Sequence, residues 1–311
     1  MPPNAVVYLL MLSVSLLWGL AFVGIKEALD HMSPATLTIL RFAVADAAIL
    51  LLALVWRGAR PARFKGDEWR IGVLALLGIP VYHLAITWGE HRTSASVAAL
   101  IVGTAPVMVA VLSALVLRES VSTRRAAGIA LAFAGVVVLA MKGSPAADGR
   151  PTQLSGVLVA LLSPASWAVY TVVGRSILPR VKAMRLTATT FLVGGVMLLP
   201  FVRAETLREI AALPAEAWAW TIFLGLGSSV AGYLIFNLAL SMVEAAKIAV
   251  FIYMVPVVAV LSAALLLGEP LTAWVALAAA MVVGGVVITE RDQRRARLES
   301  ARRAGRESSA V

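Results

Sequence analysis

Long apolar stretches alternate with short polar connections along almost the whole 311-residue chain. A helix that crosses a bilayer needs roughly 20 mainly apolar residues. The stretches are continuous and show no period of two, which disfavours a membrane β-barrel. Ten windows approach the required length: 5–25, 34–56, 70–89, 95–117, 122–141, 154–173, 184–202, 217–239, 246–267 and 272–290. The pattern predicts an all-α polytopic membrane protein with ten transmembrane helices.

The two halves of the chain repeat one another. Pro106 and Glu119 stand thirteen residues apart towards the end of the fourth window, and Pro256 and Glu269 repeat that spacing 150 residues later. Each copy of the repeat holds five windows. Because five is odd, the second copy enters the membrane upside down. Inverted repeats are typical of alternating-access carriers, whose substrate site lies near mid-membrane where the repeats meet.

The repeat defines the expected organisation of the chain. We predict a first five-helix repeat at 1–142, a linker at 143–153, a second inverted five-helix repeat at 154–290 and a basic cytoplasmic tail at 291–311. We expect the site between the first, third, fourth, sixth, eighth and ninth helices. The fifth and tenth should close each repeat from outside.

Composition and charge fit this organisation. Hydrophobic residues make up 60% and charged residues 14% of the chain, and the mean hydropathy of +0.90 excludes an ordinary soluble domain. If the N-terminus is cytoplasmic, 20 of the 27 Lys and Arg residues fall in inner segments and six in outer loops. This positive-inside bias predicts a multi-pass protein of the cell inner membrane with both termini cytoplasmic. The net charge of +10 is therefore a topology signal, and we expect the lipid bilayer rather than nucleic acid as a partner.

Several motifs together resemble a known family. The chain begins like EamA-type members of the drug/metabolite transporter superfamily, with Ser15-Leu16-Leu17-Trp18-Gly19 and Leu40-Arg41-Phe42. The set that runs from Thr93-Ser94-Ala95 through Pro106 and Glu119 to Gly135 is similar to how their first repeat closes. The second half echoes both, and the resemblance covers about 5–290. It implies ten helices, both termini inside and transport of small metabolites, often amino-acid export. Within the superfamily the chain looks closest to the aromatic amino-acid exporter branch.

Aromatic and amide side chains inside the windows are the candidates for substrate binding. Rings with a few polar groups suit a small solute whose apolar part stacks on them. Each of these side chains could instead pack against a neighbour or face lipid. The candidates are Trp18, Tyr82, His83, Trp167, Tyr233, Asn237, Phe251 and Tyr253.

A second group of residues could couple or gate transport. Arg41 and Asp46 are ionisable groups inside the second window, where charge is costly and indicates a function or a buried pairing. Pro106 and Pro256 each remove a backbone donor midway along a span, which would give a hinge, a free carbonyl or a packed kink. We expect Glu119 and Glu269 to be structural, accepting hydrogen bonds from a neighbouring helix start.

Other functions remain as alternatives. A multidrug exporter of lipophilic cations would be expected to carry a carboxylate in the first span, and residues 5–25 have none. A membrane-embedded enzyme would need a nucleophile–base pair or metal cluster, and a channel or scaffold would show no saturable flux. No phosphate-binding Gly-Lys-Ser/Thr loop occurs, so we expect no ATP use. We predict a carrier, not an enzyme, without cofactor or metal, working as a monomer or homodimer and exporting small metabolites. Amino acids, aromatic or hydrophobic, are the favoured substrates.

Overall fold

The computed structural model describes residues 3–62, 64–117, 121–143, 145, 149–174, 177, 182–242 and 251–308. Within these residues the regular structure is helical, and nine helices are long and apolar enough to cross a membrane. They are Val6–Leu29, Pro34–Val55, Glu68–His91, Ala95–Val116, Thr123–Lys142, Leu154–Gly174, Ala183–Phe201, Ala215–Phe236 and Ala273–Asp292. We number them spans 1 to 8 and span 10. A shorter apolar helix, Met254–Leu266, occupies the ninth predicted window, whose first part lies outside the described residues. We call this helix span 9.

Several spans are built from more than one element. Span 1 is α1 (Pro3–Leu29), span 2 is α2 (Pro34–Val55), span 5 is α7 (Thr123–Lys142), span 9 is α15 (Met254–Leu266) and span 10 is the first part of α16 (Ala273–Ser308). Span 3 joins α3 (Glu68–Leu76), η2 (Leu77–Val81) and α4 (Tyr82–His91), and span 4 joins α5 (Ala95–Val102) and α6 (Ala105–Leu117). Span 6 joins α8 (Leu154–Ala160) and α9 (Leu162–Gly174), and span 7 joins α10 (Ala183–Leu198) and η4 (Leu199–Phe201). Span 8 joins α12 (Ala215–Ile222), η5 (Phe223–Ala231) and α13 (Gly232–Met242); the short elements η1 (Arg57–Ala59) and α11 (Ala204–Ala211) lie in connections.

Serine residues cap the starts of three spans. The Oγ of Ser33 accepts a hydrogen bond from the backbone of Thr36, and Ser94 and Ser122 make the same contact three residues ahead. An N-cap hydroxyl satisfies one of the backbone N–H groups that a helix start leaves without a partner. The sequence therefore marks these starts locally, even though the spans themselves are almost uniformly apolar.

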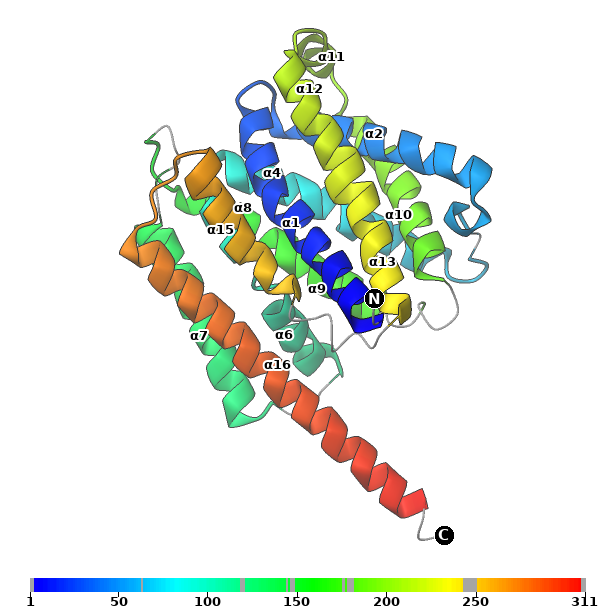
Figure 1. Ribbon diagram of the computed structural model, residues 1–311, viewed down its shortest axis with the longest axis vertical. Coiled ribbons are helices and arrows are strands. Elements are labelled where there is room, and N and C mark those ends of the chain that lie inside the picture. The colour runs from blue at the N-terminus through cyan, green and yellow to red at the C-terminus, as the bar shows by residue number, and fades with distance from the viewer. Residues whose placement is uncertain are drawn as a thin grey trace.

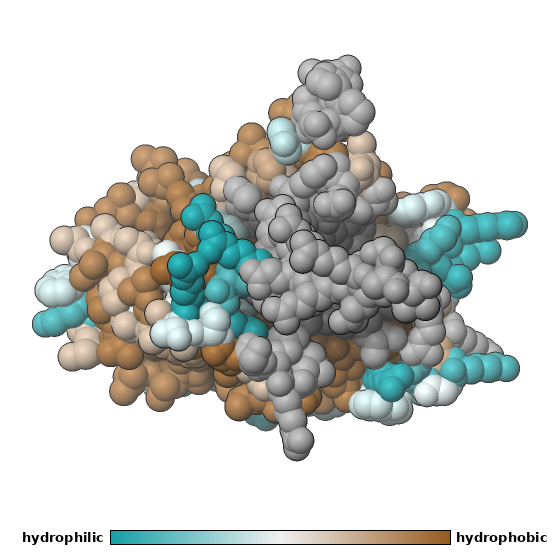
Figure 2. Space-filling view, turned by 90° about the horizontal axis from the view of Figure 1, so that it is seen from below, coloured by the Kyte–Doolittle hydropathy of each residue, from teal (hydrophilic) through white to brown (hydrophobic). Residues whose placement is uncertain are grey.

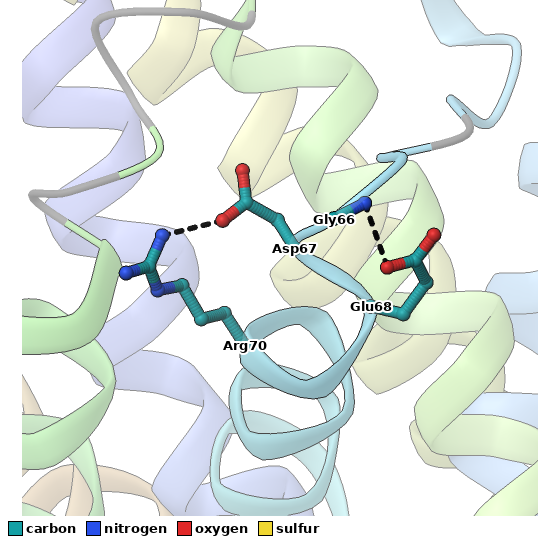
Figure 3. Close-up of polar contacts among 4 residues, drawn as sticks. All are labelled: Gly66, Asp67, Glu68 and Arg70. Atoms are coloured by element: carbon teal, nitrogen blue, oxygen red, sulfur yellow. Dashed lines mark hydrogen bonds and ion pairs between the residues drawn. The ribbon is translucent and has the colours of Figure 1, made fainter.

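The connection before span 3 is held to the helix that follows it (Figure 3). Gly66 takes a positive φ of 84°, which favours glycine, and its N–H donates to the Glu68 carboxylate over 2.8 Å. Asp67 and Arg70 form an ion pair one helical turn apart. These contacts fix where the chain turns into the bundle.

The packing of the spans repeats between the halves of the chain. Span 1 packs against spans 8 and 9, and span 6 packs against spans 3 and 4, which are the same neighbours shifted by five. Span 2 packs against spans 7 and 8, and span 7 against spans 2 and 3. Figure 1 shows the resulting bundle, with α7 and α16 side by side at one edge. This arrangement puts spans 1, 2, 3, 6, 7 and 8 around a common interior.

α7 and α16 run antiparallel at close range. A Cβ on Gly128 would meet Gly285, Ile288 and Thr289, whereas one on Gly135 would meet Ala278, Met281 and Val282. Later positions of α7 therefore face earlier positions of α16. Small residues allow such close approach, and close van der Waals packing stabilises helix pairs in a membrane, where lipid removes the hydrophobic driving force between them.

The outer surface agrees with a bilayer environment. In the view of Figure 2, apolar side chains cover much of the sides of the molecule, and hydrophilic groups gather in patches on the face and at its rim. Leu51, Leu54, Val55, Leu115 and Leu265 are all more than half exposed. Such exposure would be unfavourable in water but suits helices facing lipid.

Candidate functional site

Aromatic rings from six spans form one connected group, which we call the ring cluster. It contains five of the eight predicted substrate-binding residues, His83 among them. Its members are Trp18, Phe42, Tyr82, His83, Trp167, Tyr170, Phe191, Tyr233 and Phe236. Successive ring centroids lie between 4.6 and 5.8 Å apart, from the Phe42–His83 contact to the Tyr82–Trp167 contact. These are ordinary distances for interacting aromatic rings.

The ring cluster follows the repeat. Trp18 meets Tyr233 at 5.7 Å in one half of the cluster, and Trp167 meets Tyr82 at 5.8 Å in the other. Trp167 occupies the repeat position of Trp18, and Tyr233 that of Tyr82, with offsets of 149 and 151 residues. Since both pairs join the first helix of one repeat to the third helix of the other, the cluster lies where the two repeats meet.

Irregular helix turns lead into both tyrosines. A π-helical segment, η2 or η5, immediately precedes α4 in span 3 and α13 in span 8. π-Turns occur often at functional sites, because they turn side chains away from the regular helical register. Pro80 lies inside η2 and explains the irregular turn in span 3. In span 8, η5 carries the adjacent serines Ser228 and Ser229.

Arg41 brings a buried positive charge beside the cluster. Its Nε donates to the Ser229 hydroxyl over 3.0 Å and its Nη2 to the Ser228 hydroxyl over 3.1 Å. The guanidinium carbon lies 5.9 Å from the centroid of the Phe42 ring. Arg41 is only 6% exposed. Both hydrogen bonds are with neutral hydroxyls, which orient the guanidinium but do not neutralise its positive charge.

His83 and Asp46 lie in different surroundings. His83 is buried, with its ring edge-on to Phe42, and its Nδ1 has no hydrogen-bond partner among the described residues. The Asp46 carboxylate instead lies against Gly195 of α10: an added Cβ there would be 1.8 Å from Oδ2. Asp46 forms no ion pair with Arg41 within the described part of the chain, since the Arg41 guanidinium donates to Ser228 and Ser229.

A turn precedes each of the two predicted prolines, inside span 4 and directly before span 9. Span 4 breaks at a turn at Gly103 and Thr104, and Pro106 is the second residue of the helix that restarts. First-turn N–H groups have no partner within a helix, so proline is tolerated there. Pro106 therefore lies in the first turn of the restarted helix, and the free carbonyl expected of it stays a prediction. Pro256 similarly follows a turn at Tyr253.

The breaks of the two repeats face each other. A Cβ on Gly103 would lie 3.4 Å from Cγ of Pro256. Gly103 belongs to span 4 and Pro256 to span 9, so the contact joins the two halves of the chain. Backbone of this kind is tolerated at membrane depth only inside protein or beside a cavity. The expected hinge role of the prolines stays a prediction.

Glu269 lies at the start of span 4. One carboxylate oxygen accepts from the backbone of Ala95 over 2.7 Å, and the other accepts from the backbone and hydroxyl of Ser96 over 3.1 and 2.7 Å. Glu269 is 3% exposed. The carboxylate thus neutralises the positive end of α5 and ties the connection between spans 9 and 10 to span 4.

Two further charged side chains lie at this end of the bundle. Lys26 donates to the backbone oxygens of Glu90 and Thr93 over 3.1 and 2.7 Å. Glu90 is fully buried, and both of its carboxylate oxygens lack a hydrogen-bond partner among the described residues. We call Lys26, Glu90, Thr93 and Glu269 the end cluster.

The remaining predicted residues lie apart from the ring cluster or outside the described part. Phe251 has its ring 5.6 Å from that of Tyr8, and Tyr253 packs against Val107, Ala132 and Val286 near spans 5 and 10. Glu119 and the side chain of Asn237 lie outside the described residues. The expected site included spans 4 and 9. The ring cluster instead takes rings from spans 2 and 7.

Seven members of these clusters were not among the predicted site residues, namely Lys26, Phe42, Glu90, Thr93, Tyr170, Phe191 and Phe236. Phe42 and Phe191 look like ordinary core residues, yet they stand 149 residues apart, the same offset that relates Trp18 to Trp167. Tyr170 lies three residues after Trp167, on the same helix face, and stacks on it at 5.0 Å. Glu90 falls one residue beyond the third predicted window, 70–89, so no prediction covered it. The repeat offset and the helical spacing are the sequence signals that could have predicted these rings.

No group of three or more His, Asp or Glu side chains is placed to hold a metal ion in the part of the chain that the structure describes. The site therefore consists of rings, hydroxyls and one guanidinium. Such a set can bind a small molecule by stacking and by ionic hydrogen bonds.

Comparison with known proteins bears on this geometry. The EamA-like transporter family matches residues 5–141 and 154–291. An uncharacterized transporter of Archaeoglobus fulgidus is 32% identical over 88% of this chain and 95% of its own. A probable amino-acid metabolite efflux pump of Salmonella typhimurium is 30% identical over 90% and 93%, and a probable terminal-alkyne amino-acid exporter of Streptantibioticus cattleyicolor is 29% identical over 88% and 90%. One solved structure, described as the crystal structure of a protein, has a TM-score of 0.60 at 21% identity, covers 93% of this chain and 97% of that chain, and shares the fold.

Proposed function

Because the chain belongs to the EamA-like transporter family, we propose that this membrane transporter exports amino acids with aromatic or hydrophobic side chains. The observation that carries the proposal is Arg41, a buried guanidinium held by two serine hydroxyls beside the ring cluster. Transport proceeds by alternating access and uses no ATP.

The chemistry of an amino acid matches the two parts of this site. A carboxylate offers the negative charge that Ser228 and Ser229 do not supply to Arg41, and guanidinium binds carboxylate in a two-point geometry. Rings of the cluster, such as Trp18 and Trp167, would pack on the apolar side chain. The carboxylate thereby anchors the solute and the rings select its side chain.

The packing of the halves supports the mechanism. Antiparallel α7 and α16, together with neighbours that repeat after five spans, are what two inverted five-helix repeats at residues 1–142 and 154–290 would produce. We infer ten spans in all, with span 9 completed by the residues before Met254. The charge bias of the connections favours the inner membrane, with both termini cytoplasmic.

The alternative of a lipophilic-cation exporter fits the site less well. A cation entering the ring cluster would meet the positive charge of Arg41, which repels it at short range. Two relatives are named as exporters of amino acids or their metabolites, which agrees with a carboxylate-bearing substrate. The carrier would work as a monomer or homodimer.

Saturable uptake into proteoliposomes tests the proposal. A panel of radiolabelled amino acids is measured with and without an imposed pH gradient. Arg41→Gln should abolish saturable uptake, because the substrate carboxylate loses its counter-charge, whereas the exposed control Arg208→Gln should transport normally. Saturable transport of a lipophilic cation with no amino-acid uptake would refute the proposal.

Coupling to protons is tested by the same assay. Asp46 lies in span 2 against Gly195, where a carboxylate inside the membrane is a candidate proton carrier. Asp46→Asn should then retain exchange of labelled for unlabelled amino acid but lose stimulation by the pH gradient. Unchanged stimulation would remove Asp46 from the coupling mechanism.

A further inference from the structure

Glu90 is a buried acid that the proposed substrate site does not use. It is the last but one residue of span 3 and is 0% exposed. Neither carboxylate oxygen has a hydrogen-bond partner within the described residues. An ionised carboxylate without donors is strongly unfavourable in a dry interior, whereas the neutral acid is far less so.

The charges around Glu90 do not remove this penalty. Lys26 on α1 is the nearby cation, but its ammonium group donates to backbone oxygens and not to the carboxylate. Glu269 brings a second negative charge, and Arg41 on α2 acts on Glu90 without contact. Within the described residues, the other elements packed against α4 are η2, α5, α8 and α9, which carry no charged side chain and one titratable group, Tyr170.

The two acids of the end cluster are therefore in opposite situations. Glu269 receives three hydrogen bonds at the start of α5 and is stabilised as an anion. The Glu90 carboxylate receives none from the residues that the structure describes, and a second negative charge there would be repelled by the first. This difference assigns a neutral, protonated acid to Glu90 while it is enclosed as the structure shows it.

We propose that Glu90 is a proton-binding site of the outer gate, protonated when the gate is closed and ionised when it opens. This inference rests on the proposed alternating-access function and on cytoplasmic termini, which place the end cluster on the outside. Opening lets water reach the carboxylate and frees Lys26 to act as its counter-ion. External acid then favours the closed gate and external alkali the open gate.

Cysteine labelling measures the gate directly, since the chain contains no native cysteine. Thr93 is 2% exposed and would be shielded while the gate is closed, so Thr93→Cys is the reporter. Gln153 is exposed nearby, and Gln153→Cys corrects for the pH dependence of the reagent itself. A membrane-impermeant maleimide is added to right-side-out vesicles of the full chain at external pH from about 5.5 to about 8.

We expect the labelling rate of Thr93→Cys relative to Gln153→Cys to rise about tenfold across this range. In Glu90→Gln, which imitates the protonated acid, the ratio should stay low and flat. Glu90→Asp keeps a titratable group and should restore a pH response. The control Glu205→Gln, in an exposed connection, should behave like the parent.

Three results would overturn the inference: an equal rise in Glu90→Gln, a flat ratio in the parent chain, or no labelling of Thr93→Cys at any pH. Labelling needs no substrate, so it stays interpretable even if the amino-acid panel is not transported. Conversely, saturable amino-acid uptake with a flat labelling ratio would refute the proton gate alone.

Discussion

A methyl group added to Gly285 would lie 2.4 Å from the carbonyl oxygen of Gly128 and 2.6 Å from the backbone nitrogen of Ala132. Both atoms belong to the α7 backbone and cannot rotate away. Ordinary van der Waals contact requires 3.4–4 Å, so Gly285→Ala should push α7 and α16 apart by about 1 Å. Overpacking of this kind typically costs about 1–3 kcal/mol.

The neighbouring glycine provides a matched control. A Cβ on Gly284 would meet only Leu131, at 3.7 Å from Cδ2, which is ordinary contact. Alanine is preferred over glycine in a helix by about 1 kcal/mol, and both substitutions gain that preference. The difference in unfolding free energy between Gly285→Ala and Gly284→Ala therefore isolates the packing cost.

Unfolding of the purified protein in mixed detergent micelles measures this difference. We expect Gly285→Ala to be less stable than Gly284→Ala by about 1–3 kcal/mol. Equal stability of the two variants, within about 0.5 kcal/mol, would show that α7 and α16 are not held at the distance the structure gives. The antiparallel contact that supports inverted repeats would then lose its basis.

Three other outcomes can be checked. Arg41→Lys keeps the charge but loses the planar fork, and should raise the amino-acid KM about tenfold with little change in kcat in exchange assays. Glu269→Gln removes the charge that caps α5, worth about 1.5–3 kcal/mol for hydrogen bonds to a charged group, and should speed maleimide labelling of Thr93→Cys; unchanged labelling would contradict a gate role. Burial raises the pKa of Glu209, but hydrogen bonds from Thr36 and Ser33 outweigh it and hold the pKa below its usual value. The ionised Glu209 therefore stabilises the folded protein above its unfolded-state pKa, and this stabilisation is lost as the pH falls through its folded-state pKa. Lowering the pH should therefore reduce the difference in thermal stability between the parent and Glu209→Gln.

Much of the fold could be predicted because the membrane constrains the sequence so strongly. Every span must satisfy its own backbone, which requires long apolar helices, and nine of the ten windows correspond to such helices within the described residues. The family resemblance stated from motifs such as Ser15–Gly19 is confirmed by the two matched segments. Serines such as Ser94 marked helix starts by a local hydrogen bond.

The candidate site was predicted less completely, for a physical reason. In a membrane helix the faces turned to lipid and to the interior are both apolar, so periodicity does not distinguish them. Tyr82 and Trp167 join the ring cluster, whereas the equally plausible Phe251 packs against Tyr8 near the start of span 1. Phe42 was passed over because nothing local separates it from a core residue.

The sequence by itself determined the family, the helical membrane architecture and the duplicated unit, since hydropathy, charge bias and repeat spacing are properties of the chain. Only the tertiary structure decided which polar groups meet. Arg41 donates hydrogen bonds to serines 187 and 188 residues further along the chain, and Glu269 accepts one from a helix start 173 residues before it. Such pairings depend on how the spans of opposite halves pack. That packing also left the Glu90 carboxylate without a hydrogen-bond partner among the described residues, which no local pattern could have revealed.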